Sequence, residues 1–165
     1  MELDTADLTL RTVKTTDVEE VMRMWEWQDG AVSADKAMEA ILWMQENHKK
    51  NKQGYIHHLC FAVYKKGLNK IIGWCGLDGQ CSPGKTVLFY SIHSDYQNKG
   101  YATQCAAKLL SYTFNEMGIS SINGGCDKNN KASFKVMSKI GMKQNGFEEN
   151  GDPLFYIDNK QFRSL

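Results

Sequence analysis

The segment with the clearest chemical content runs from Tyr90 to Thr103, where an apolar stretch ends, a polar loop follows and a helical pattern begins. Within it, Gln97, Gly100 and Ala102 have the spacing Q-x-x-G-x-A. A helix N-terminus has unpaired backbone N–H groups and a partial positive charge, which suits a pyrophosphate. An ordinary strand-to-helix turn also uses glycine for its backbone freedom, so the pattern alone is weak. The segment has neither the G-K-[ST] of a P-loop nor the G-x-G-x-x-G of a dinucleotide site.

A second candidate lies at the start of a later helix. Asn129 or Asn130 is suited to cap this helix, and Gly141 is suited to end it. Ser133 falls in its first turn, where a hydroxyl can donate a proton to a reacting group or bond to the local backbone. Both roles stay open for Ser133 at this point.

The remaining reactive side chains argue against metal or thiol chemistry. The cysteines are odd in number, widely spaced and free of any C-x-x-C pair, so we predict free thiols rather than a disulfide scaffold or a zinc site. His57 and His58 are adjacent, which is unsuited to one metal face. A cysteine-based hydrolase would need Cys126 beside a histidine, and neither Cys126 nor Cys105 has an evident partner. We therefore predict no metal.

Composition restricts the class of protein. The 165 residues are 42% hydrophobic and 24% charged, with a net charge of +1, which is typical of one globular domain over residues 1–165. No basic run supports nucleic-acid binding. The first ten residues do not resemble a signal peptide, and no stretch approaches the ~20 apolar residues of a membrane span. We expect a cytoplasmic protein with no nucleic-acid or membrane partner.

The elements that must position these residues follow the order βααβββαβαββ. Strand–helix–strand units occur only in the second half, which favours a mixed sheet covered by helices. We predict strands over residues 8–13, 59–64, 70–77, 86–93, 119–126, 142–147 and 154–157, and helices near 18–30, 33–52, 101–117 and 129–141.

Three of these blocks together resemble the GNAT superfamily of N-acetyltransferases. Residues 97–102 match its coenzyme A signature, Q/R-x-x-G-x-G/A, and residues 127–142 match its N-x-x-S-x-x-V helix followed by K-x-G-F/M. Residues 8–11 followed by Asp17 are similar to the opening of the RimJ/RimL-like branch, which acetylates ribosomal-protein N-termini. The resemblance spans roughly residues 8 to 157, and agreement of three blocks in order is more specific than any one.

The resemblance implies an α/β GNAT fold, with a central mixed, mostly antiparallel sheet of about six to seven strands and flanking helices. It also implies acetyl-CoA as co-substrate. The backbone of residues 90–92 would pair with the pantetheine arm as an added strand, and the amides of residues 98–103 would hold the pyrophosphate. The coenzyme-binding residues so implied are Tyr90, Ser91, Ile92, Gln97, Asn98, Lys99, Gly100, Tyr101, Ala102, Thr103, Asn130 and Ser133.

The same resemblance assigns two catalytic tasks. The backbone N–H of Ile92 would stabilise the oxyanion of the tetrahedral intermediate. Ser133 matches the serine that some members place near the coenzyme thiol. Many other members use a tyrosine seven residues after the asparagine, where this chain has Met137. Ser133, or water, is therefore the remaining candidate for the proton donor.

The general base is missing from its usual position. Members of this branch often have a glutamate early in the fourth strand, where this chain has Val87. Asp78 and His93, at the ends of neighbouring strands, are the nearest replacements; a loop-capping aspartate and an exposed strand-end histidine are the alternative interpretations. An α-amine, with a pKa of about 7.7 to 8.0, needs less help than a lysine at about 10.4.

The acceptor side rests on Trp25, Glu26 and Asp29, which enter the loop that borders the acceptor groove in the family and could hold a cationic amine. A core role for Trp25 is the alternative. We predict direct attack by a primary amine, from a protein N-terminus or a small molecule, on acetyl-CoA in a ternary complex. The competing hypothesis is a non-catalytic acyl-CoA-binding or sensor module, and the protein would be a monomer or a homodimer.

Overall fold

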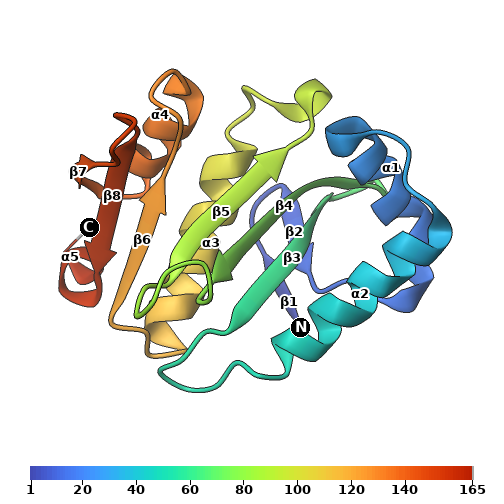
Figure 1. Cartoon of the computed structure of the whole chain (residues 1–165), viewed down its shortest axis with the longest axis horizontal. Coiled ribbons are helices and arrows are strands. Elements are labelled where there is room, and N and C mark those ends of the chain that lie inside the picture. Colours follow the sequence, from blue (N-terminus) through green and yellow to red (C-terminus); the bar gives the residue numbers. More distant parts are fainter. Residues whose placement is uncertain (165) are drawn as a thin grey trace.

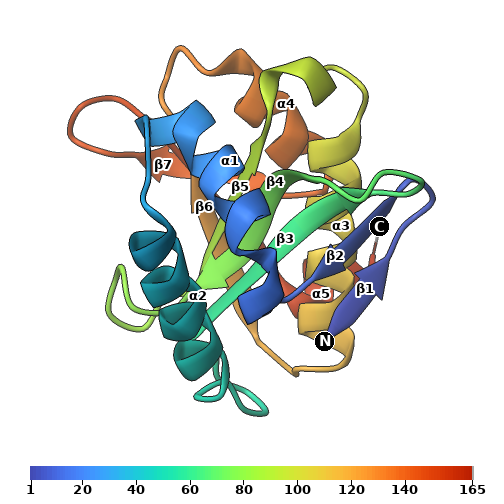
Figure 2. The same cartoon turned by 90° about the vertical axis from the view of Figure 1, so that its right-hand side faces the viewer.

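One mixed sheet of eight strands forms the centre of the molecule, with helices on both faces (Figures 1 and 2). The computed structural model describes residues 1–164 and, within them, every side chain except that of Asp29. Only β5 and β6 are parallel neighbours; the other pairs are antiparallel. In spatial order the strands are β1 (Glu2–Asp4), β2 (Leu8–Arg11), β3 (His58–Lys65), β4 (Ile71–Asp78), β5 (Val87–Ile92), β6 (Ser121–Gly125), β8 (Pro153–Asp158) and β7 (Lys143–Phe147).

The helices divide between the two faces of the sheet. Helices α1 (Val18–Asp29) and α2 (Ala34–His48) cover one face, and α3 (Tyr101–Asn115), α4 (Lys131–Lys139) and α5 (Asn159–Arg163) cover the other (Figure 2). Each face has its own apolar core. Fully buried Phe61, Leu109 and Phe114 belong to the core beneath α3, and Met24 and Ile41 to the core beneath α1 and α2.

The predicted fold class and element order are confirmed, with two additions. A three-residue strand, β1, precedes the predicted elements, and α5 follows them, so the sheet has eight strands rather than six or seven. Three residues are too few for an alternating pattern to be visible in the sequence. Helix α2 ends at His48 instead of Lys52, because Asn51 turns the chain by bonding to the backbone of His57 and His58.

No helix within residues 1–164 combines the length and the apolar character needed to cross a membrane.

The connection between β2 and α1 is built around the ion pair of Arg11 and Asp17. Arg11, the last residue of β2, anchors the start of α1 through Asp17. Its Nη1 and Nη2 donate to the two carboxylate oxygens of Asp17 at 2.7 and 2.8 Å, and Nη2 also donates to the hydroxyl of Tyr64 at 2.8 Å. Asp17 accepts a further bond from the N–H of Lys14 at 2.7 Å. Burial opposes ionisation of Asp17, but these hydrogen bonds outweigh it and hold the pKa of the carboxyl below its ordinary value.

Replacing Asp17 with Asn should lower the free energy of unfolding by about 2 kcal/mol near pH 7, because charge-assisted hydrogen bonds are lost. A folded-state pKa below the unfolded value means that the stabilisation is present above about pH 4 and is lost as the pH falls through the folded pKa. Urea unfolding of both proteins across this range measures the difference. Exposed Glu39→Gln is the control, with a change within about 0.5 kcal/mol. A difference independent of pH would contradict this account.

Candidate active site

The site begins where the sheet comes apart. Strands β5 and β6 are joined at the pair Val87 and Asn123, where the N–H of Asn123 donates to the carbonyl of Thr86 at 2.8 Å. Beyond this pair the two strands diverge toward their C-terminal ends, beneath α4 (Figure 1). The backbone groups of β5 that face the gap consequently have no neighbouring strand, and such groups need another partner.

The register with β4 determines which backbone groups face the gap. The N–H of His93 donates to the carbonyl of Ile72 at 2.8 Å, and a Cβ on Gly73 would lie 2.2 Å from the carbonyl oxygen of Ser91. Because backbone direction alternates along a strand, Ser91 and His93 bond toward β4, whereas Tyr90 and Ile92 point toward the gap. The prediction that the backbone of Ser91 also pairs with the coenzyme is therefore wrong.

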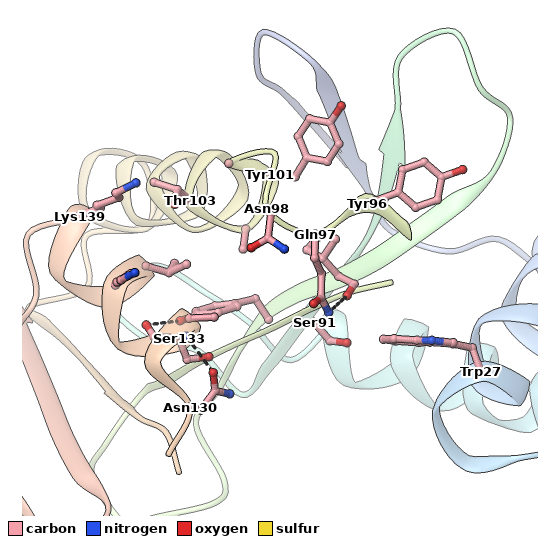
Figure 3. Close-up of a pocket in the computed structure, with 17 residues that line it drawn as sticks. Trp27, Ser91, Tyr96, Gln97, Asn98, Tyr101, Thr103, Asn130, Ser133 and Lys139 are labelled. Atoms are coloured by element: carbon pink, nitrogen blue, oxygen red, sulfur yellow. Dashed lines mark hydrogen bonds between the residues drawn. The ribbon is translucent and has the colours of Figure 1, made fainter. Parts of the chain in front are cut away.

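A cavity of about 530 Å³ occupies the gap, between β5, the N-terminus of α3 and one face of α4 (Figure 3). It brings together the predicted coenzyme-binding residues with the exception of Lys99. Its lining consists of Trp27, Tyr90, Ser91, Ile92, Tyr96, Gln97, Asn98, Gly100, Tyr101, Ala102, Thr103, Asn130, Ala132, Ser133, Lys135, Val136 and Lys139.

The start of α3 presents a row of free amides to this cavity. Gly100 is the N-cap residue with a φ of 77°, and it has no side chain with which to cap the helix. The first helical bond runs from the N–H of Gln104 to the carbonyl of Gly100, at 3.0 Å. Within residues 1–164, the N–H groups of residues 98–103 have no protein acceptor. Together with the helix dipole, they form a site suited to an anion.

Two side chains of the preceding loop have roles that the sequence did not indicate. Gln97 donates from Nε2 to the carbonyl of Ile92 at 2.7 Å and so ties the loop to the end of β5. The side chain of Lys99 turns away from the cavity and donates to the carbonyl of Asp95 at 2.9 Å, so the predicted part of Lys99 in coenzyme binding rests on its backbone N–H. Lys135 and Lys139 of α4 line the cavity instead and supply its positive charge.

Helix α4 forms the opposite wall. Asn130 caps it by accepting the N–H of Ser133 at 3.0 Å, and the hydroxyl of Tyr90 donates to the carbonyl of Ser133 at 3.1 Å. Burial raises the pKa of Tyr90 to about 12, so its proton stays in place near neutral pH. Ser133 lines the cavity, and its hydroxyl has no hydrogen-bond partner among the described residues. Met137 is buried against Gly124 and leaves Ser133 as the hydroxyl of α4 in the cavity wall.

Asp78 does not belong to this site. It pairs with Val87 at the start of β5, whereas the cavity adjoins Ile92, which pairs with Gly73 at the other end of the two strands. Its carboxylate accepts the N–H of Gln80 at 2.7 Å. The structure therefore supports the loop-capping interpretation and corrects the prediction of a general base.

His93 lies near the cavity, but its hydrogen bonding disfavours a role as general base. Its Nδ1 accepts the N–H of Asp95 at 3.3 Å, while the carboxylate of Asp95 lies 3.8 Å away, beyond hydrogen-bond distance. A neutral ring whose Nδ1 accepts a hydrogen bond has its proton on Nε2, which then has no lone pair to receive another. The ring is also covered by Trp27, with the ring centroids 4.6 Å apart.

Comparison with known proteins identifies the fold and the family. Residues 5–143 match the acetyltransferase (GNAT) domain family. The chain belongs to the GNAT family of acetyl-CoA-dependent N-acetyltransferases. It is 47% identical over 56 residues to the uncharacterised N-acetyltransferase YnaD of Bacillus subtilis, a match that covers 34% of this chain and 33% of YnaD.

Solved structures share the GNAT fold over nearly the whole chain. The ribosomal-protein-S5-alanine acetyltransferase of Vibrio fischeri superimposes with a TM-score of 0.83 at 19% identity, covering 98% of each chain. RimJ of Mycobacterium smegmatis, solved in complex with a CoA-disulfide, has a TM-score of 0.78 at 14% identity and covers 93% of this chain and 83% of RimJ.

On the acceptor side of this GNAT domain, the structure supports the core interpretation of Trp25, while the role of Glu26 stays a prediction. Trp25 is partly buried against the core beneath α1 and α2, and Glu26 is exposed. The side chain of Asp29 lies outside the described residues. Trp27 is the aromatic residue that lines the cavity. Side chains two residues apart on a helix point in nearly opposite directions. The spacing of Trp25 and Trp27 therefore indicated that only one of them could face the core.

Thiol and metal chemistry find no support in the structure. Within residues 1–164, no group of three or more histidine, cysteine or carboxylate side chains is arranged to hold a metal ion. The five cysteines are all free. Burial raises the pKa of Cys105 to about 12 and also raises that of Cys126. Both thiols are therefore neutral near pH 7 and poor nucleophiles, which disfavours a hydrolase.

Gly100→Glu should weaken binding of acetyl-CoA at least about tenfold, because it introduces a carboxylate among amides that would face a pyrophosphate. Gly67→Glu is a matched control, since Gly67 also has a positive φ, 81°, and open space around its Cα, but lies in the β3–β4 turn. The two variants share the backbone strain of a non-glycine residue at positive φ. Calorimetry should find lost affinity for Gly100→Glu only; equal affinities would refute the anion site.

Proposed function

We propose that this GNAT acetyltransferase transfers the acetyl group of acetyl-CoA to an amine that is already partly neutral near pH 7: the α-amine of a peptide or protein, or a small-molecule amine of similarly low pKa. The observation that carries the proposal is the cavity at the parted strands, where unpaired N–H groups of β5 and of α3 converge. Among the described side chains, neither Asp78 nor His93 is arranged as a general base, which supports an acceptor that needs little help in losing its proton.

Acetyl-CoA would lie along β5 with its pyrophosphate on the amides that precede and begin α3. Lys135 and Lys139 would face the phosphates, and the N–H of Ile92 would bond to the pantetheine arm as an added strand does. Coenzyme A in the solved RimJ structure supports this assignment by fold alone. The other free N–H of β5, that of Tyr90, lies deeper, next to the point where β6 joins.

This depth leads us to reassign the oxyanion donor. Gln97 connects Ile92 to the loop proposed for the pyrophosphate. Ile92 would therefore lie beside the middle of the pantetheine arm and not beside the thioester at its end. The hydroxyl of Tyr90 donates to the carbonyl of Ser133 at 3.1 Å, which links this position on β5 to the helix turn that carries the candidate proton donor. We therefore propose the N–H of Tyr90, in place of that of Ile92, for the oxyanion.

The chemistry then has three parts. The amine nitrogen attacks the thioester carbon, and the carbonyl electron pair moves to the oxygen, where the N–H of Tyr90 stabilises it. The nitrogen loses a proton to solvent. When the carbonyl re-forms, the C–S bond breaks, and the departing thiolate receives a proton from the hydroxyl of Ser133, which solvent then reprotonates.

The pH dependence of kcat/KM should follow the ionisation of the acceptor amine, because only the neutral amine attacks and no enzyme base removes its proton. Two peptides should be compared, one with a free α-amine and one with a blocked N-terminus and a single lysine. The first profile should level off near pH 8, and the second should still rise through pH 9.

A single inflection shared by both peptides would instead indicate a base on the enzyme. His93→Gln provides the accompanying control, since the inflection for the α-amine peptide should not move when this ring is replaced. A shifted inflection in His93→Gln would restore the histidine as a base.

Ser133→Ala should reduce kcat by about 10²-fold or more and leave the affinity for acetyl-CoA nearly unchanged, because a proton donor acts chiefly in the transition state. Ser138→Ala is the matched control on the same helix, because its hydroxyl donates to the carbonyl of Phe134 at 3.0 Å and faces away from the cavity. Thiol release and peptide mass measure turnover. Full turnover by Ser133→Ala would assign the proton to water. Tight binding with no transfer by the wild type would favour the non-catalytic coenzyme-binding module.

A further inference from the structure

Phe89 has an unusual position on β5. Side chains alternate along the strand, so Phe89 and Ser91 point to the face covered by α1 and α2, while Tyr90 points toward α4. On the adjacent strand, Gly76 lies directly opposite Phe89. A Cβ on Gly76 would lie 2.2 Å from Cζ of the Phe89 ring, so the ring rests on β4 in the space that only glycine leaves free.

Two further rings hold Phe89 in this position. His58 of β3 stacks on it with ring centroids 5.9 Å apart and an angle of 20° between the planes. Trp43 of α2 meets the edge of His58 at 4.8 Å. Burial lowers the pKa of His58, so this central ring is neutral and packs as an uncharged aromatic. The row Trp43, His58 and Phe89 thus forms a wall across the sheet.

This wall borders the path that the acceptor amine would take. The coenzyme cavity opens on the face of β5 that carries α3 and α4, which leaves the opposite face for the incoming amine. Trp27 and Ser91, both cavity-lining, belong to that opposite face, so the cavity reaches it. The hydroxyl of Ser91 accepts a hydrogen bond from Gln28 at 2.9 Å, which closes one side. Phe89 lies two residues before Ser91 on the same strand, about 7 Å away, and closes the other side of this path.

We infer that Phe89 is a specificity-determining residue that limits the size of the first side chain of the acceptor. On this inference the first side chain of the acceptor lies above Tyr90, between Phe89 and the Ser91–Gln28 pair, so that an N-terminal Gly, Ala or Ser is accepted and Leu or Phe is excluded. This inference rests on the proposed transfer to an α-amine. It assigns to the ring a task distinct from coenzyme binding, since Phe89 is outside the cavity lining.

The test is a panel of peptides that differ only in their first residue, assayed with wild type and Phe89→Ala. The ratio of kcat/KM for the Leu peptide to that for the Ala peptide should rise about tenfold or more in Phe89→Ala, since a few methylene groups in an apolar site change selectivity by that order. The KM for acetyl-CoA should not change. Phe147→Ala is the control, because Phe147 is 65% exposed on β7 and distant from the site; its ratio should equal that of wild type.

Phe89→Leu, which removes less volume, guards against misfolding of the alanine variant and should shift the ratio in the same direction by a smaller factor. Wild-type transfer to small and large N-termini with equal efficiency, or a ratio unchanged in both Phe89 variants, would overturn the inference while leaving the proposed function intact. Binding of acetyl-CoA by all variants with no transfer to any peptide would overturn this inference, and a further lack of transfer to small-molecule amines would overturn the proposed function.

Discussion

Beyond Leu88, the backbone of β5 has hydrogen-bonding groups on one edge and no strand to receive them, and the rest of the site depends on this. An unpaired, desolvated backbone group is unfavourable by about 1–3 kcal/mol, so such an edge is tolerated only where water or a ligand reaches it. The parting of β5 from β6 creates that access. The start of α3 likewise has backbone N–H groups without a protein partner, because Gly100 has no side chain that could cap the helix. The site is thus the region that the fold leaves incomplete, and a ligand with matching acceptors completes it.

The walls of the site are set by a few bonds, each of which joins two elements. Gln97 fixes the loop to the last carbonyl of β5, and Tyr90 fixes the first turn of α4 to the same strand. Asn130 caps the start of that helix by accepting the N–H of Ser133. A cavity between elements held in this way needs little reordering when a ligand enters, so less affinity is lost to conformational entropy. Arg11 and Asp17 have the same function on the other side, where they set the start of α1 and hence the direction in which Trp27 approaches.

The local sequence pattern was sufficient to predict the helices and strands, but not the directions in which their backbone groups and side chains point. Hydrophobic period and capping residues located nearly every strand and helix, and the Q-x-x-G-x-A spacing located the free amides. The backbone direction of Ser91 and the position of Asp78 were predicted wrongly for one physical reason: strand register depends on partners distant in sequence. His93 was near the site, but the hydrogen bond that decides its tautomer comes from the turn that follows it. The ring of Phe89 required knowledge that Gly76 lies across from it.

One face of β5 is proposed to bind acetyl-CoA and the other to receive the acceptor amine, and this difference explains why the identity of the acceptor is hard to infer. On the face of α3 and α4, backbone N–H groups supply most of the contacts proposed for acetyl-CoA, and backbone geometry tolerates wide change in side chains. On the other face, the side chains of Phe89, Ser91 and Trp27 border the path proposed for the acceptor amine. A shared fold at 19% identity therefore supports the proposal for the coenzyme face but gives no information about the side chains of the acceptor face. Under the proposed assignment, acceptor selectivity rests on individual residues above β5, which can be exchanged to change it independently of coenzyme binding.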